Sequence, residues 1–155
     1  MLSVPEVVQV EARPAAAIHL HIPAKDMGKY MDPAIQELLE VIGAQSQHPS
    51  GPMFSFHLQR PGEEFNFEIG FPVDGRIKEE GRVRMIERPG GRVVRAIHTG
   101  PYEGLKRSWQ ELQEWVKNEH LPVIEMFWES YLTDPGQEPD PKKWRTELNW
   151  VIERK

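Results

Sequence analysis

Cysteine is absent from the 155-residue chain, and so are long apolar runs. Without cysteine the chain forms no disulfide and no thiolate metal site, which fits a reducing compartment. No segment approaches the roughly 18 to 20 apolar residues that span a bilayer, and the N-terminus lacks the basic and apolar regions of a signal peptide. We therefore expect a soluble, cytoplasmic protein with no membrane association.

Motifs for phosphate binding, nucleophilic catalysis and zinc binding are absent too. The sequence contains no glycine-rich phosphate loop, no G-x-S-x-G turn and no H-E-x-x-H pair. His19 and His21 alternate onto one face of a predicted strand, but no third ligand follows at a suitable spacing. We expect no metal and no cofactor.

Charge argues against nucleic-acid binding. The net charge is −5, whereas a surface that neutralises phosphates is basic. Residues 76–95 hold seven basic side chains, but Glu79, Glu80 and Glu87 are interleaved with them. Such a mixture is typical of a solvated face.

The first half of the chain is predicted to form strands around one helix. Residues 4–11 and 15–22 are rich in Val and Ile and predict a bent strand or a pair of strands. Asp32-Pro33 predicts a helix start, because Asp caps free amides and Pro is favoured at the first helical position. Residues 51–59 and 64–73 alternate in polarity and predict a hairpin with its turn at residues 60–63.

The second half repeats this order. Residues 81–88 and 92–99 predict a second hairpin around Pro89-Gly90-Gly91. An amphipathic helix follows and should end near Asn118, with apolar residues at Leu105, Trp109, Leu112 and Val116. Residues 125–133 and 144–153 predict two final strands.

Local similarities support a duplication. Met53-Phe54 is similar to Met126-Phe127, and the segment from Glu68 to Val73 is similar to the segment from Glu147 to Ile152. We predict an α+β fold in a single domain over residues 1–155, with approximate repeats 1–75 and 80–155. Its antiparallel sheet would carry two helices on one face, with a pocket between the repeats.

Strand alternation selects candidate binding residues. Phe127, Glu129 and Tyr131 share one face of their strand, while Trp128 has the parity of the opposite, core face. Glu147 is displayed opposite a bulky apolar stripe. The other four tryptophans are interpreted as core residues, and they are Trp109, Trp115, Trp144 and Trp150.

Three blocks stand out in the second half of the chain, HTGPYEGL at 98–105, WESYLTDP at 128–135 and WRTEL at 144–148. Together they resemble the GyrI-like family, which includes effector-binding domains of AraC-type and MerR-type multidrug regulators. The resemblance implies a pocket for hydrophobic, often cationic compounds, with its acids at Glu129 and Glu147 and its tyrosine at Tyr102. Regulator members carry a DNA-binding region before this domain. Nothing of that kind precedes the first strand here, so we expect no direct DNA binding.

We predict a domain that binds small hydrophobic or cationic drug-like molecules. The predicted ligand-binding residues are Glu147, Glu129, Tyr131, Tyr102, Phe127, Trp128, Phe56 and Glu68. Two alternatives stay open. One is a hydrolase of strained cyclopropane compounds, with Glu147 and Tyr102 as catalytic residues, and the other is a protein-interaction module such as a protector of DNA gyrase. A structural interpretation of the two acids, paired with Arg145 or a nearby lysine, also remains.

Overall fold

The chain divides into two compact units. The computed structural model describes residues 1–57 and 64–154. Unit 1 consists of Met1–Glu11 and Gly90–Lys155, and unit 2 is the continuous segment Ala12–Pro89. Each unit contains one helix and an antiparallel sheet among its described residues, so the predicted α+β class is confirmed.

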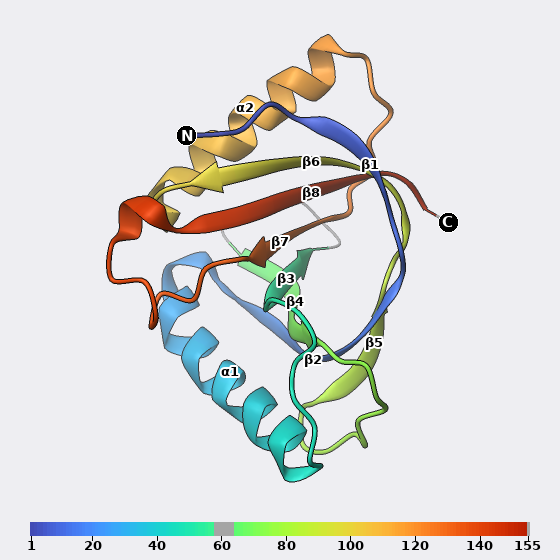
Figure 1. Cartoon of the computed structure of the whole chain (residues 1–155), viewed down its shortest axis with the longest axis vertical. Helices are drawn as coiled ribbons and strands as arrows, with labels where there is room; N and C mark the ends of the chain where they lie inside the picture. Colours follow the sequence, from blue (N-terminus) through green and yellow to red (C-terminus); the bar gives the residue numbers. More distant parts are fainter. Residues whose placement is uncertain (58–63, 155) are drawn as a thin grey trace. The chain divides into compact units, whose positions relative to one another are not determined.

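Unit 2 places helix α1 against one face of its sheet (Figure 1). The sheet has the order β3-β4-β2-β5, with every pairing antiparallel. Its elements are β2 (Arg13–Pro23), α1 (Met27–Ala44), β3 (Phe54–His57), β4 (Glu64–Pro72) and β5 (Arg84–Arg88). The predicted hairpin is confirmed by the pairing of β3 with β4, and its turn at residues 60–63 lies outside the described residues.

The core of unit 2 follows from alternation along β2. Ile18, Leu20 and Ile22 point toward α1 and are buried, while His19 and His21 occupy the other face. From α1, Leu38 and Ile42 complete this core at a spacing of four residues.

Unit 1 repeats the arrangement with α2 beside β6 (Figure 1). Its sheet has the order β1-β6-β8-β7, again antiparallel. Its elements are β1 (Glu6–Val10), β6 (Gly91–Thr99), α2 (Leu105–Asn118), β7 (Phe127–Tyr131) and β8 (Arg145–Arg154). Leu112 and Val116 of α2 pack on Leu148 and Trp150 of β8, as the apolar spacing in the helix predicts.

The first strand of each repeat pairs outside its own repeat. β1 pairs with β6, from Glu6 opposite Arg95 to Val10 opposite Gly91, and β5 pairs with β2. The predicted hairpin around Pro89-Gly90-Gly91 is therefore wrong, because β5 and β6 belong to different units. Alternation identified both strands, but it carries no information about which strand each one pairs with.

Helix α1 begins earlier than the sequence predicted. It starts at Met27 rather than near Asp32, so Pro33 lies inside the helix. Proline there has no N–H to donate to the carbonyl of Lys29, and the helix continues to Ala44 without that hydrogen bond. α2 ends at Asn118, where the sequence predicted its end. None of the helices formed by the described residues is long and apolar enough to cross a membrane.

Candidate ligand-binding site

The candidate site is built on β7 of unit 1. Phe127, Glu129 and Tyr131 alternate onto the face that α2 covers, since Glu129 lies opposite Leu148 and Phe127 opposite Trp150 in the register with β8. The short strand therefore presents an aromatic ring, a carboxylate and a phenol on the helix side of the sheet.

Glu129 accepts two hydrogen bonds, one at each carboxylate oxygen. The Trp109 indole N–H donates to Oε2 at 2.7 Å, and the Tyr131 hydroxyl donates to Oε1 at 2.9 Å. Burial raises the pKa of Glu129, although the bonds from Trp109 and Tyr131 and the nearby His98 act in the opposite direction. The carboxylate is thus held by two neutral donors in an environment that disfavours its charge.

Aromatic rings surround this carboxylate. The Tyr102 ring lies 5.9 Å from that of Tyr131 and 5.0 Å from that of Trp144, and the Trp109 ring lies 4.8 Å from that of Phe127. Tyr102 is 37% exposed, so the cluster reaches solvent at this residue. Burial, followed by the nearby carboxylates of Asp134 and Glu129, raises the pKa of Tyr102.

His98 holds the turn that carries Tyr102. Its Nε2 lies 3.0 Å from the Pro101 carbonyl, which can only accept, so in the neutral ring this nitrogen carries the proton. Nδ1 then accepts from the Ser108 hydroxyl at 2.6 Å. A Cβ added at Gly104 would lie 3.0 Å from the His98 ring, so glycine lets the turn close on the imidazole.

Glu147 lies on the opposite face of the same sheet. Glu147 lies opposite Ser130 in the register of β7 with β8, and it shares its face of the sheet with the pair formed by Trp128 and Asn149, two positions away. Its Oε1 is 3.3 Å from Arg95 Nη2 and accepts from Asn149 Nδ2 at 3.0 Å. Of the residues predicted from sequence, the structure thus brings together Glu129, Tyr131, Tyr102 and Phe127, and places Glu147 and Trp128 on the other side.

The remaining predicted residues belong to unit 2. Phe56 is buried at 6% exposure and lies opposite Glu68 in the register. Glu68 Oε1 lies within hydrogen-bond distance of His19 Nδ1, at 3.1 Å, on the face of the sheet away from α1. Among the described residues, no group of three His, Asp or Glu side chains is arranged to hold a metal ion.

Unit 2 carries no carboxylate at the position equivalent to Glu129. Glu68 pairs with Phe56 as Glu147 pairs with Ser130, so Ser55 is the counterpart of Glu129 and His57 the counterpart of Tyr131. The His57 ring stacks on Phe67 at 5.1 Å, and burial lowers its pKa from 6.5 to about 4. The equivalence also corrects the proposed match of Phe54 with Phe127, because the pairing makes Trp128 the counterpart of Phe54.

Two tryptophans that sequence reasoning assigned to the core belong to the site. Trp109 packs against Phe127 and Trp150 as expected, but its N–H also binds Glu129. Trp144 donates to the Glu138 carbonyl at 2.8 Å and presents its ring to Tyr102. A buried indole N–H needs an acceptor, and this requirement could have indicated that Trp109 and Trp144 make polar contacts as well as packing contacts.

Comparison with known structures identifies the fold. The C-terminal domain of EcmrR superposes with a TM-score of 0.82 at 20% identity, covering 98% of each chain. EcmrR in its DNA complex gives a TM-score of 0.84 at 21% identity, and there the match covers 98% of this chain but spans 58% of the EcmrR chain. No curated protein matches the sequence.

Two further structures have the same fold at lower identity. SAV2435 bound to tetraphenylphosphonium has a TM-score of 0.73 at 10% identity, covering 97% of this chain and 94% of its own. A hydrolase encoded by lin2189 from Listeria innocua has a TM-score of 0.68 at 15% identity, covering 96% and 91%. The family model described as GyrI-like small molecule binding domain matches residues 3–152. The chain therefore belongs to the GyrI-like small molecule binding domain family.

Proposed function

We propose that this protein binds hydrophobic organic cations at the cluster of Glu129, Tyr102, Tyr131, Trp109 and Trp144. The observation that carries the proposal is the half-buried Glu129 carboxylate, whose two hydrogen-bond donors, Trp109 and Tyr131, are both neutral. A carboxylate in apolar surroundings gains most from an opposite charge. A bound cation supplies that charge.

The aromatic rings support the same ligand class. Tyr102 and Trp144 offer ring faces beside the acid, and cation–π attraction contributes about 0.5 to 2 kcal/mol. Asp134, which also raises the pKa of Tyr102, adds negative potential at this end of the cluster. SAV2435, which shares the fold, is bound to a lipophilic cation, tetraphenylphosphonium.

Calorimetric titration with tetraphenylphosphonium tests the proposal. Glu129→Gln keeps the size of the side chain but removes the charge, so affinity should fall by about 1 to 3 kcal/mol, or roughly 5- to 150-fold. Neutral triphenylphosphine oxide should bind both forms equally. Equal binding of the cation by wild type and Glu129→Gln would remove Glu129 from the site.

Glu147→Gln is the matched control. This substitution makes the same change on the neighbouring strand, but Arg95 already matches the charge of Glu147. We expect affinity to change by less than about twofold. A large loss in Glu147→Gln instead would support the assignment of Glu147 made from sequence.

A second candidate function is hydrolysis of a strained cyclopropane electrophile, favoured by the raised pKa of Glu129. A carboxylate with a raised pKa is a stronger base than an exposed glutamate. Glu129 would accept a proton from water as the water oxygen bonds to one ring carbon. The strained C–C bond then breaks, and the carbon that keeps the electron pair receives the proton. A product heavier by one water, absent with Glu129→Gln, would establish this reaction.

A further inference from the structure

Unit 2 has an open cavity of about 620 Å³, while Glu129 and its aromatic neighbours all belong to unit 1. This volume is within the usual range for small-molecule sites. Gln45, at the C-terminal end of α1, forms one wall, and Met85 of β5 forms another. The rest of the lining comes from Arg76, Ile77, Lys78 and Glu79, in the segment between β4 and β5.

The end of α1 fixes the backbone of this segment. The Gln45 side chain makes two hydrogen bonds with the backbone of Lys78. Gln45 Nε2 donates to the Lys78 carbonyl at 2.9 Å, and the Lys78 N–H donates to Gln45 Oε1 at 2.7 Å. Gln47 Nε2 donates to the Arg76 carbonyl at 2.9 Å. A Cβ at Gly75 would lie 2.5 Å from Gln47 Oε1, so a larger residue there would displace the Gln47 amide.

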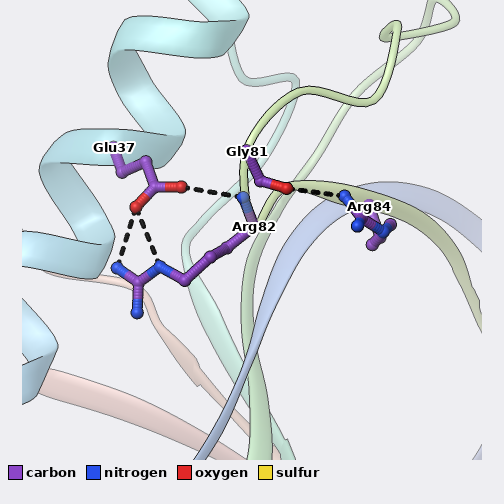
Figure 2. A network of polar contacts seen from close by, with 4 residues as sticks. All are labelled: Glu37, Gly81, Arg82 and Arg84. Atoms are coloured by element: carbon purple, nitrogen blue, oxygen red, sulfur yellow. Dashed lines mark hydrogen bonds and ion pairs between the residues drawn. The ribbon is translucent and has the colours of Figure 1, made fainter.

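Figure 2 shows a second anchor further along the same segment. Glu37 of α1 accepts from Arg82 Nε at 2.9 Å and from the Arg82 backbone N–H at 3.1 Å, and Arg82 lowers the pKa of Glu37. Arg84 Nη1 donates to the carbonyl of Gly81, whose φ is 58°. The cavity wall is thus preorganised although most of it is irregular backbone.

The net charge of the cavity lining is positive. Arg76 and Lys78 are exposed, and within the described parts of the chain their side chains make no hydrogen bond or ion pair. The Glu79 carboxylate keeps its negative charge and accepts the neutral Met85 N–H at 3.0 Å, so the lining holds two cations and one anion and its net charge is positive. Ile77 is 2% exposed and belongs to the floor of the cavity, so the accessible apolar surface comes from the half-buried Met85.

We propose that this cavity is a second binding site, for a small amphipathic monoanion. A carboxylate or sulfonate is held by Arg76 and Lys78, and the apolar body of the ligand packs on Met85. The cavity would bind anions, whereas the Glu129 cluster would bind cations. A ligand of one charge is therefore not expected to occupy both sites.

The probe for this site is 8-anilinonaphthalene-1-sulfonate, a monoanion whose fluorescence increases in apolar surroundings. Arg76→Gln combined with Lys78→Gln should weaken its binding about tenfold, since each exposed ion pair contributes up to about 1 kcal/mol. The matched control is Lys106→Gln with Lys117→Gln, which removes the same charge from exposed positions on α2. We expect no change in that control.

Neutral N-phenyl-1-naphthylamine and saturating tetraphenylphosphonium complete the test. The neutral dye should bind the double variant and the wild type equally, and the cation should not displace the sulfonate. In an amide NMR titration, the resonances of residues 76–79 and 85 should shift. The proposal is overturned if the sulfonate fails to bind the wild type at millimolar concentration, binds the double variant equally, or shifts resonances of unit 1 instead.

Discussion

Glu129 and Glu147 lie on two paired strands and point to opposite faces of one sheet. Glu129 is held by the neutral donors Trp109 and Tyr131, whereas Glu147 is matched by the guanidinium of Arg95. The two acids that the sequence grouped together therefore have different environments. Of the two carboxylates, Glu147 has a cationic side chain as a direct partner, and Glu129 has two neutral donors.

Arg95→Ala should destabilise the protein by about 1 to 3 kcal/mol, because it removes the cation that pairs with Glu147 and the donor to Oδ1 of the fully buried Asn149. Urea unfolding measures the change. Arg107→Ala is the control, since its pair with Glu111 at 3.6 Å is exposed, and it should cost less than about 0.5 kcal/mol. Equal effects in the two variants would contradict a structural role for the buried network.

Affinity for tetraphenylphosphonium should depend on pH through Glu129. Because burial raises its pKa, the carboxyl group remains protonated to higher pH than an exposed glutamate. A cation binds the ionised form, so affinity should rise as pH rises through this raised pKa and then level off. Calorimetry across mildly acidic to mildly alkaline pH gives the profile. Glu129→Gln should give a flat one, and a pH dependence that survives this substitution would point to another group.

Acid should destabilise unit 2 through His57. Burial lowers its folded pKa from 6.5 to about 4, so the folded state favours the neutral ring. The resulting stability is fully present above about pH 6.5 and is lost as pH falls toward 4, by up to about 3 kcal/mol. His57→Phe keeps a ring beside Phe67 and removes the titration, so urea unfolding of this variant should lose that part of its pH dependence. An unchanged pH dependence would show that His57 is not the responsible group.

Gly104→Ala should impair ligand binding more than stability. Its Cβ would lie 3.0 Å from the His98 ring, which displaces the turn that carries Tyr102. We expect tetraphenylphosphonium affinity to fall about tenfold and unfolding to cost about 1 kcal/mol. Gly28→Ala in α1, where the new Cβ meets no atom within 4 Å outside the adjoining helix backbone, should instead stabilise by up to about 1 kcal/mol. Unchanged affinity in Gly104→Ala would separate this turn from the site.

Local patterns in the sequence predicted the elements well but not their partners. Alternation located β5 and β6, and the apolar spacing of α2 located its end at Asn118. The pairing of β1 with β6 joins Glu6 to Arg95, and no short-range signal specifies such a distant partner. The early start of α1 was missed because Pro33 resembles a first-turn proline.

The candidate site was predicted only in part, because it too depends on contacts between residues that are distant in the sequence. Strand parity placed Phe127, Glu129 and Tyr131 on one face, and the register with β8 confirms that they share it. The prediction that the core lies on the opposite face, with Trp128, is wrong for unit 1, because Phe127 packs into the core that α2 covers. The sequence did not indicate which face of β7 α2 covers, nor that Arg95 pairs with Glu147, because both depend on tertiary contacts. The contribution of Trp109 was missed because apolar spacing describes its ring and says nothing about its N–H.

The exchange of first strands also sets the order in which the chain can mature during synthesis. Unit 2 is one continuous segment, so all of its strands have been made once Pro89 has been added. β1 is synthesised before the other seven named strands, yet β6, its partner, follows some eighty residues later, and the sheet of unit 1 is complete only with β8. A nascent chain therefore keeps β1 without its partner while unit 2 folds, and unit 1 is completed last.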